Sequence, residues 1–506
     1  MKNKNQETER AVRPPIVVVM GHIDHGKSTL LDYIRSTNTA EREAGGITQH
    51  VGAYEVAVKH GDLAKKITFI DTPGHEAFSK MRTRGANIAD LAVLVVAADE
   101  GVKPQTMEAH GAIKEAGIPY VIALNKIDKP NAEPEKIKAQ LGENGIYVEG
   151  YGGNVPYANL SAKTGQGVPE LLDLILLQAE LEDLKADSDQ NASGIVVESN
   201  LDAKRGVSST LIIKNGTMKK GLFVVCGEAL APVRIFEDFR GQSLETATFS
   251  SPVIITGFDS LPETGSEFLT FNSKKEAEQS VAKFRAEKLD FKKTSSPPES
   301  PQKTEKENKV FIPLLLKTDV AGSLEALEKE LLKLQDEEVV IGVLKKGVGA
   351  IGEEDARFAS TSQNFIVFGF NVSADAPAKE ILERNRIPFF LSDIIYKISD
   401  WLKEEVARRK AEIPREEIIG VAKILKTFSR SKNKQVIGGK VLSGKIVEGK
   451  AFKIKRRDAE IGDGKITNLQ QGKKEAKEVE TGLEFGAMTE NKIEIAKDDE
   501  IVIVGK

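Results

Sequence analysis

The sequence predicts an α/β domain with a mainly parallel sheet, followed by a β-barrel, a small α/β sandwich, a long linking helix and a C-terminal β-barrel. Three observations indicate this order. Apolar strands alternate with helical segments as far as Leu184. Short strands separated by turns recur after Gly194 and again after Gly420, and strand–helix alternation returns between residues 310 and 402. At 506 residues the chain is too long for one hydrophobic core.

Shifts in composition set the limits of these parts. The first residues are polar, and residues 295–301 are rich in serine and proline, which is typical of a linker. In chain order we expect a disordered tail at residues 1–12, the first α/β domain at 13–188, the first barrel at 189–290, a linker at 291–308, the sandwich at 309–402, the end of the linking helix at 403–417 and the C-terminal barrel at 418–506.

The elements of the first domain follow from apolar runs and helical periodicity. We expect strands at Ile16–Met20, Tyr54–Val58, Ile67–Ile70, Leu91–Ala97, Tyr120–Leu124 and Tyr157–Leu160, and helices at Ser28–Arg35, Gln105–Ala116, Glu133–Leu141 and Val168–Leu184. Residues 185–193 are polar and resemble a linker. In the first barrel we expect strands at Gly194–Glu198, Ser209–Lys214, Leu222–Val225, Ala231–Phe236 and Val253–Gly257. A doubly wound parallel sheet binds its ligand at the carboxyl ends of its strands.

The first domain is organised around the segment Ile16–Thr29. A buried strand is broken by Gly21, and Gly26-Lys27-Ser28 opens a helix, which is the spacing of a phosphate-binding loop. Inward-facing backbone N–H groups and the helix N-terminus bind phosphates, Lys27 reaches the outer phosphates, and the Ser28 hydroxyl holds magnesium. The predicted loop residues are Gly21, His22, Ile23, Asp24, His25, Gly26, Lys27 and Ser28.

Two further motifs follow predicted strands. After Ile67–Ile70, Asp71 can hold magnesium and Gly74 can offer its N–H to a terminal phosphate. After Tyr120–Leu124 comes a motif whose carboxylate can accept two hydrogen bonds from guanine, a pair that adenine cannot supply. That motif is Asn125, Lys126 and Asp128, and Ser161, Ala162 and Lys163 can close over the base. Together these motifs predict a P-loop GTPase domain that binds GTP or GDP with Mg²⁺.

These motifs resemble those of a known family. The segment Gly21–Lys27 resembles the phosphate loop of translational GTPases, and Glu43–His50 and Asp71–Arg84 resemble the two switches of bacterial translation initiation factor 2. The resemblance implies that Thr48, with Ser28 and Asp71, binds magnesium. It also implies that His75 orients the attacking water, and that Ile23 and Ile47 form an apolar gate that keeps this histidine out beforehand.

The resemblance implies a function as well. Members of this family recruit initiator formylmethionyl tRNA to the small ribosomal subunit, promote subunit joining and hydrolyse GTP when the ribosome stimulates them. We therefore expect ribosomal subunits, initiator tRNA and other initiation factors as partners of a cytoplasmic monomer. The single cysteine, Cys226, and the lack of a long apolar run agree with a cytoplasmic protein without disulfides.

The C-terminal barrel carries a cluster of positive charge. Between Lys423 and Arg457 there are twelve lysines and arginines against Glu448 alone. Such a balance favours contact with an RNA backbone, and the resemblance implies that this domain holds the acceptor end of initiator tRNA. The residues expected at that contact are Lys440, Lys453, Arg456, Glu484, Phe485 and Gly486. Lys440 and Phe485 stand where family members usually carry cysteines.

Two alternative functions are considered. One is an elongation-type tRNA carrier, which the order barrel, sandwich, long helix and barrel argues against. The other is a GTP-sensing scaffold that binds RNA without useful hydrolysis. Replacing His75 by alanine discriminates the second alternative, because hydrolysis stimulated by ribosomes should then be lost only if this histidine is catalytic.

Overall fold

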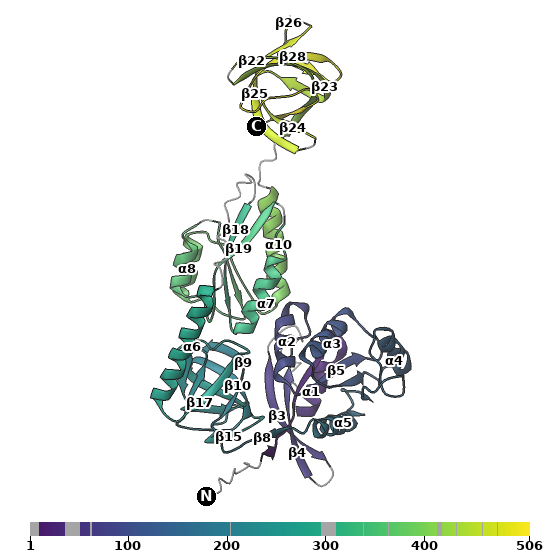
Figure 1. Ribbon diagram of the computed structural model, residues 1–506, viewed down its shortest axis with the longest axis vertical. Helices are drawn as coiled ribbons and strands as arrows, with labels where there is room; N and C mark the ends of the chain where they lie inside the picture. Colours follow the sequence, from purple (N-terminus) through teal and green to yellow (C-terminus); the bar gives the residue numbers. More distant parts are fainter. Residues whose placement is uncertain are drawn as a thin grey trace. The chain divides into compact units, whose positions relative to one another are not determined.

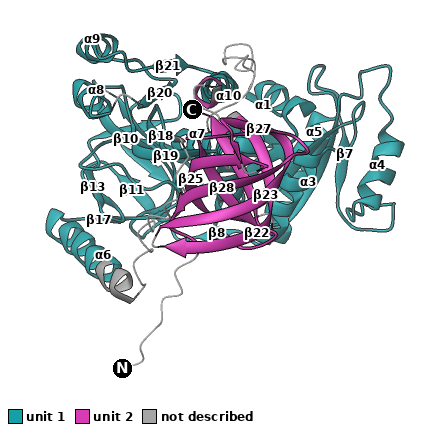
Figure 2. Cartoon of the chain, turned by 90° about the horizontal axis from the view of Figure 1, so that it is seen from above, with its two compact units in different colours: residues 1–407 teal, residues 408–506 magenta. Residues whose placement is uncertain are grey.

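The computed structural model describes residues 10–35, 51–60, 63–202, 204–294, 310–336, 338–362, 364–411, 417–431, 433–457, 459–472 and 474–505. The chain divides into two compact units, residues 1–407 and 408–506 (Figure 2). Most of the expected tail, the segment with Ile47 and Thr48, and most of the linker at 291–308 lie outside the described residues.

The first domain is a six-stranded sheet flanked by helices (Figure 1). The strand order is β3 (Gly52–His60), β4 (Leu63–Asp71), β2 (Ile16–Gly21), β5 (Leu91–Ala97), β6 (Tyr120–Asn125) and β7 (Tyr157–Asn159). Only the β3–β4 pair is antiparallel. The helices are α1 (Lys27–Arg35), α2 (Ser79–Ile88), α3 (Pro104–Ala116), α4 (Pro134–Glu143) and α5 (Val168–Leu181). Apolar clusters lie on both faces of the sheet, which confirms the expected doubly wound architecture.

Two features of this domain differ from the expectation. Helix α2 was not predicted, because its ten residues include one lysine, two arginines and one glycine and lack a clear apolar stripe. The chain start is also ordered earlier than expected, because β1 (Ala11–Val12) pairs antiparallel with β8 (Lys185–Ala186). Two-residue strands are too short to leave a periodic signal in the sequence, so the assignments of a tail through residue 12 and a linker from residue 185 were wrong at these positions.

The second domain is a strongly curved antiparallel sheet. Its strand order is β13 (Ala229–Pro232), β12 (Phe223–Cys226), β17 (Glu267–Phe271), β9 (Ser193–Asp202), β10 (Gly206–Asn215), β16 (Pro252–Phe258) and β14 (Ile235–Asp238). A separate pair joins β11 (Thr217–Lys219) to β15 (Thr246–Thr248). The interior is apolar and includes the buried Cys226. The expected single strand Ala231–Phe236 is wrong, because the chain turns after Pro232 and continues as β14 at the other end of the sheet.

The third domain is the expected α/β sandwich. Helix α6 (Lys274–Thr294) precedes it and packs on the second domain through Ala277 and Val281. The parallel sheet has the order β19 (Val339–Val348), β18 (Val310–Thr318), β20 (Ile366–Phe370) and β21 (Phe389–Ser392). Its helices are α7 (Ala321–Leu332), α8 (Glu353–Ala359), α9 (Ala376–Arg384) and α10 (Ile395–Ala411). The expected linking helix is α10, which buries Ile398 and Leu402 in the core of this domain.

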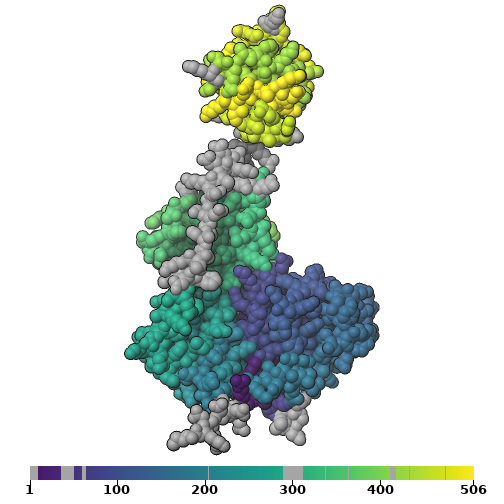
Figure 3. All heavy atoms as spheres, in the orientation of Figure 1, coloured from purple at the N-terminus to yellow at the C-terminus, as the bar shows by residue number. Residues whose placement is uncertain are grey.

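The first and second domains are joined by a buried charge cluster, and their atoms meet directly (Figure 3). Asp90, immediately before β5, accepts two hydrogen bonds of 2.6 Å from the Arg13 guanidinium and one of 2.9 Å from the N–H of Ile16. Lys214 of the barrel lies 3.3 Å from the same carboxylate. Ser250 donates to the carbonyl of Pro14 at 2.6 Å, which adds a contact beside the cluster.

All three domains of the first unit meet at Glu198. Its Oε1 accepts hydrogen bonds from the N–H groups of Ser199 at 3.0 Å and of Gly322, at the start of α7, at 3.2 Å. A Cβ on Gly322 would lie 2.3 Å from the Met81 side chain of α2, so only glycine allows this approach. Burial raises the pKa of Glu198 to about 7, although the two backbone hydrogen bonds and Arg84 oppose the shift.

We expect Glu198→Gln to flatten the pH dependence of stability. Because the folded pKa is about 7 and the ordinary value is 4.5, the folded state holds this proton more tightly. The contribution of Glu198 to stability is therefore greatest below about pH 4.5 and falls, on the order of 3 kcal/mol, as pH rises to 7. The neutral amide keeps the accepting oxygen without the buried charge. Denaturant unfolding should show that Glu198→Gln stabilises the protein at pH 8 but not at pH 5, and an equal effect at both pH values would contradict the assignment.

The C-terminal unit is a closed β-barrel. Six strands form a ring in the order β22 (Glu417–Ser431), β29 (Glu500–Gly505), β24 (Ala451–Arg456), β25 (Ala459–Gln471), β28 (Glu484–Asn491) and β23 (Lys434–Val447), and a β22–β23 pairing closes it. Two short strands, β26 (Lys474–Glu475) and β27 (Glu478–Glu480), pair outside this ring. The interior is apolar. The expected C-terminal β-barrel is confirmed.

Candidate functional site

The phosphate loop connects the carboxyl end of β2 to the start of α1. Gly21 ends β2 with φ +142°, and a Cβ there would lie 2.3 Å from the carbonyl oxygen of Val95. A 3₁₀ turn, η1 (Ile23–His25), follows, and Gly26 has φ +85°. Both glycines therefore stand where a side chain would be strained or would collide. The turn leads directly into the N-terminus of α1, and a helix N-terminus suits a phosphate.

Lys27 places a buried ammonium group in this loop. Its Nζ donates to the carbonyls of Gly21 at 3.0 Å and His22 at 2.7 Å. Burial lowers the pKa of Lys27 to about 8, and the charge of Asp71 opposes the shift. A Cβ on Gly74 would lie 2.4 Å from this Nζ, so the turn after β4 touches the loop only because it carries glycine. A buried cation bound mainly to carbonyls is suited to an anionic ligand.

Two of the residues expected to hold magnesium, Asp71 and Ser28, lie at the end of β4 and in the first turn of α1. Asp71 is the last residue of β4 and is aligned with Val19 of β2. Thr72 fixes this end of β4, since its hydroxyl donates to the Val19 carbonyl at 2.9 Å. Ser28 lies in the first turn of α1. A carboxylate and a hydroxyl are oxygen donors of the kind Mg²⁺ prefers, so these residues fit the ion. Thr48 lies outside the described residues.

Asn125 ties the base-binding motifs to the phosphate loop. Its Nδ2 donates to the carbonyl of His25 at 2.9 Å, and its Oδ1 accepts from the N–H of Ala162 at 2.9 Å. The Ser161 hydroxyl donates to Asp128 at 2.7 Å. The structure therefore brings three segments that are far apart in the sequence into one network at the carboxyl edge of the sheet. Asp128 remains exposed and available to a ligand, as does Lys163.

His22 and His25 of the loop are held by contacts that the sequence does not predict. Gln105 of α3 accepts from the N–H of Ile23 at 3.3 Å, and the same oxygen accepts from His22 Nδ1. His25 is fully buried, with Nδ1 3.4 Å from the Val95 carbonyl. Burial and the neighbouring His22 lower the pKa of His25 to about 4, so it is neutral at pH 7. These roles are structural, and no local pattern in the sequence signals Gln105.

The turn that carries His75 is held by a buried arginine. Arg82 of α2 donates to the carbonyls of Pro73, at 3.1 Å, and His75, and pairs with Glu108 of α3 at 2.5 Å. Since the guanidinium is occupied by these contacts and 2% exposed, Arg82 acts as a clamp on the turn. Arg84 pairs with Glu325 of the third domain. His75 itself is buried at the end of this turn, and its partner Ile47 in the expected gate lies outside the described residues.

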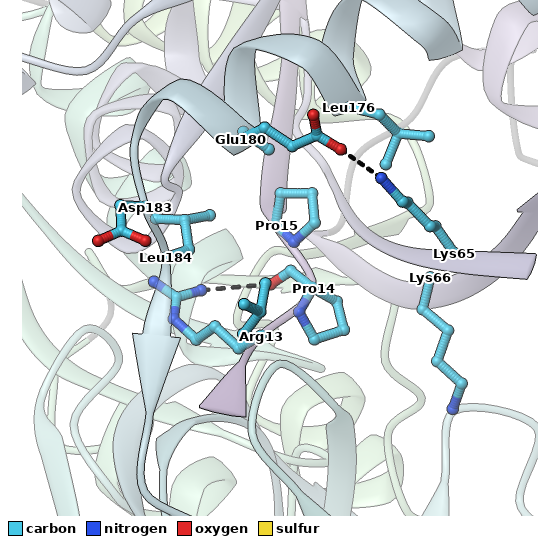
Figure 4. Close-up of a pocket in the computed structure, with 11 residues that line it drawn as sticks. Arg13, Pro14, Pro15, Lys65, Lys66, Leu176, Glu180, Asp183 and Leu184 are labelled. Carbon is cyan, nitrogen blue, oxygen red and sulfur yellow. Dashed lines mark hydrogen bonds and ion pairs between the residues drawn. The ribbon is translucent and has the colours of Figure 1, made fainter. Parts of the chain in front are cut away.

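A separate cavity lies at the opposite edge of the same sheet. It has a volume of about 310 Å³ and is lined by Pro14, Pro15, Leu176 and the Lys65–Glu180 ion pair (Figure 4). These residues surround the amino end of β2, whereas every nucleotide-binding motif lies at the carboxyl ends of the strands. The cavity is therefore distinct from the candidate nucleotide site.

Folding of the C-terminal barrel pairs part of the expected basic cluster with acidic residues. Five of the twelve cations pair with acidic residues from later in the barrel, namely Lys423 with Asp498, Arg430 with Glu494, Lys445 with Glu478, Lys453 with Glu460 and Arg456 with Asp499. Over residues 418–506 there are 19 basic and 13 acidic residues, a net charge of +6. The local excess is thus partly neutralised on folding, although the unit remains basic.

The six residues expected to contact tRNA do not share one environment. Lys440 and Glu484 are exposed and face each other across β23 and β28. Phe485 is 5% exposed and packs in the barrel core. A hollow of about 450 Å³ lies beside Glu484, Phe485 and Gly486, and the exposed Phe428 lines it. Lys453 and Arg456, on β24, do not line this hollow.

Three family models match the chain. Residues 13–180 match the elongation factor Tu GTP binding domain, residues 191–271 match elongation factor G domain 2, and residues 286–403 match translation-initiation factor 2. Among the described residues, none of the helices has the length and apolar character needed to cross a membrane. The crystal structure of GDP-bound aIF5B from Aeropyrum pernix is 27% identical and covers 98% of this chain and 92% of its own, with a TM-score of 0.47.

Three curated relatives carry the same name. The translation initiation factor IF-2 of Nitratiruptor sp. is 43% identical over 97% of this chain and 58% of its own length. That of Aquifex aeolicus is 41% identical over 97% of this chain and 60% of its own length. The chain therefore spans about three-fifths of the length of these two relatives. That of Halothermothrix orenii is 41% identical over 99% of this chain and 73% of its own length. The resemblance seen in the motifs is confirmed, and the chain belongs to the translation initiation factor IF-2 family.

Proposed function

We propose that this chain is a GTP-dependent translation initiation factor. It recruits initiator formylmethionyl tRNA to the small ribosomal subunit, promotes subunit joining and hydrolyses GTP when the ribosome stimulates it. The observation that carries the proposal is the network through Asn125, which links His25 of the phosphate loop to Ala162 beside the base-binding carboxylate. Family membership supports the same function.

The proposed mechanism is hydrolysis by positioning and charge neutralisation, because phosphoryl transfer needs little covalent assistance. Lys27 offsets charge on the β- and γ-phosphates. Magnesium, when bound through Ser28, Asp71 and Thr48, supplies further charge neutralisation and orients the phosphates. His75 holds the attacking water. Since Arg82 is committed to the turn and to Glu108, it does not serve as an arginine finger, and turnover without ribosomes should be slow.

The proposal is tested by measuring GTP hydrolysis with and without ribosomes. We expect His75→Ala to lower the stimulated rate by roughly 10²- to 10⁴-fold, the range for removing a group that assists proton transfer. GTP binding should persist, because the imidazole bonds to the N–H of Ala77 in its own turn. His110→Ala, a histidine on α3 bonded to Tyr120 at 3.2 Å, is the matched control and should leave the rate unchanged. Equal stimulation of wild type and His75→Ala would refute the catalytic role.

The tRNA part of the proposal concerns the C-terminal barrel. We infer that initiator tRNA contacts the basic surface and the hollow beside Glu484, with Lys440, Lys453, Arg456, Phe485 and Gly486 as the expected contact residues. The net charge of +6 and the exposed Phe428 support this. Filter binding of formylated and unformylated initiator tRNA to the full chain tests it, and failure to bind either would remove this part of the function.

A further inference from the structure

The imidazole of His75 is enclosed on every side that the structure describes. The side chain is 3% exposed, and its Nδ1 accepts a hydrogen bond of 2.8 Å from the N–H of Ala77. A nitrogen that accepts carries no proton, so the proton of the neutral ring is on Nε2. That Nε2 is buried and has no hydrogen-bond partner among the described residues. A donor left without a partner in a buried place is unfavourable and needs an explanation.

The ring that covers His75 comes from the third domain. Tyr396, in the first turn of α10, lies with its ring centroid 4.0 Å from that of His75, at an interplanar angle of 45°. Phe78 lies against the imidazole edge-on at 5.8 Å. Tyr396 is 42% exposed, so its ring stands between the histidine and solvent. His75 and Tyr396 are far apart in the sequence and meet only because the third domain packs on the turn after β4.

The surrounding turn is built into the core of the third domain. Ala77, Phe78 and Met81 belong to the same apolar cluster as residues of β18, α7 and α10. Polar contacts surround this cluster. Glu76 pairs with Lys333 at 2.9 Å, the Ser79 hydroxyl bonds to Lys329 at 2.6 Å, and Arg84 pairs with Glu325. The position of the histidine therefore depends on the position of α7 and α10.

Other clusters and cavities of the molecule give weaker grounds for a proposal. His22, His25 and Glu100 each offer a ligand atom within 4.8 Å of the others, but Glu100 is already paired with Lys126 at 3.0 Å and both histidines belong to the phosphate loop. The cavity beside Pro14 and Pro15 has nothing that indicates its ligand. The contact between Tyr396 and His75 is supported by ring geometry, by burial and by the unpaired Nε2 together.

We propose that Tyr396 is a positioning residue that holds His75 in a resting pose on the third domain, so that activation requires the imidazole to leave this ring. The inference rests on the proposed function, because it concerns the histidine assigned to GTP hydrolysis. Leaving the ring gives Nε2–H access to water and relieves its unpaired state. Separation of α10 from the turn is then the step that readies the site, and it precedes the positioning of water.

The state of His75 can be followed without any hydrolysis assay. Burial lowers the pKa of His75 to about 4, and the charged groups around it are Glu76 and Arg82 on its own segment and Glu330 and Lys333 on the α7 side. In Tyr396→Ala the ring is uncovered, and we expect its pKa to rise toward 6.5. The chain has six histidines, so histidine side-chain NMR can resolve the titration, with His75→Gln assigning the signal.

The test compares Tyr396→Ala with Tyr396→Phe and with the control Tyr147→Ala, a tyrosine of the first domain that is 53% exposed. In the absence of ribosomes, Tyr396→Ala should hydrolyse GTP about threefold to tenfold faster, which is the factor expected from the loss of one aromatic pair. Tyr396→Phe keeps the ring and should behave as wild type, as should Tyr147→Ala. An unchanged His75 titration in Tyr396→Ala would overturn the proposal.

A structural control separates uncovering of His75 from loss of the helix. Trp401 is the single tryptophan and lies on α10 between Phe368 and Phe390, with ring centroids at 5.5 and 5.6 Å. Unchanged fluorescence of Trp401 shows that α10 is still docked. If Tyr396→Ala shifts this fluorescence, the His75 titration is measured in Tyr396→Leu instead. That variant keeps apolar bulk at the position but lacks the aromatic ring. A raised His75 pKa with no hydrolysis in any variant would support the positioning role while contradicting the proposed function.

Discussion

We expect Asp128→Asn to change the base specificity of the nucleotide site from guanine to xanthine. The Asp128 carboxylate accepts from Ser161 at 2.7 Å and is exposed on its other side, where two guanine N–H groups can reach it. An asparagine side chain presents one acceptor and one donor, so its NH₂ group would face a guanine donor and leave both unpaired. We expect GTP affinity to fall by roughly 10⁴-fold, as for other sites built around a buried polar pair.

Xanthosine triphosphate supplies the complementary arrangement. It has a carbonyl oxygen where guanine has its amino group, so the amide introduced by Asp128→Asn can donate to it and still accept from the neighbouring N–H. Competition against a fluorescent nucleotide measures both affinities. Asp99→Asn, beside Lys126 at 3.8 Å, removes a nearby charge without changing a base contact and should leave the GTP-to-XTP ratio unchanged. A variant at Asp128 that still prefers GTP would remove this residue from the base site.

Asp90→Ala should strongly destabilise the first unit. It removes a carboxylate that is 8% exposed and leaves Arg13, 10% exposed, and Lys214 without their partner. Breaking one side of a buried ion pair costs about 3–5 kcal/mol. Urea unfolding followed by Trp401 fluorescence measures the loss. Glu245→Ala breaks a pair with Lys220 in which the two side chains are 78% and 39% exposed, and it should cost less than about 1 kcal/mol.

The Asp90 cluster also predicts a pH dependence. Burial acts to raise the pKa of Asp90, but the hydrogen bonds from Arg13 and the charge of Lys214 outweigh it, so the pKa lies below its ordinary value of 3.8. Because the folded state releases this proton more readily, the stabilisation is present above about pH 4 and is lost as pH falls through the folded pKa. Wild type and Asp90→Ala should therefore converge in stability in strong acid, and a constant difference would contradict the assignment.

Local sequence patterns were enough to predict the architecture and the motifs of the phosphate loop. The strand Ile16–Met20, the glycines of the phosphate loop and the apolar runs at β5 and β6 carry their signal within a few residues. The same holds for the linking helix α10 and the C-terminal barrel. Parallel strands bring their carboxyl ends to one edge, so the meeting of Lys27, Asp71 and Asn125 follows from the fold class alone.

Contacts between distant segments could not be predicted in this way. Three such contacts join different domains: the ring contact of Tyr396 with His75, the hydrogen bond of Gly322 to Glu198 and the ion pair of Lys214 with Asp90. Nothing in the neighbourhood of any of these residues in the sequence signals its partner. Helix α2 was missed for a related reason, because Arg82 is buried by its bonds to Pro73 and Glu108 and not by an apolar stripe.

Counting charges along a stretch of sequence also misses contacts between distant segments. The excess around Lys423–Arg457 is large in the sequence, yet Glu478, Asp498 and Asp499 reach back from later strands and neutralise part of it. The strand β22 also pairs with both β23 and β29, which lie at opposite ends of the barrel segment. Only the closed ring shows which cations remain available to RNA.

The sheltered thiol of Cys226 has a practical consequence. Burial raises its pKa well above the ordinary value, so maleimides and mild oxidants should find no reactive sulfur on the native surface. A cysteine introduced in each of the two units could then be labelled selectively with a donor and an acceptor dye. Energy transfer between them would report how far apart the nucleotide end and the basic barrel lie in solution.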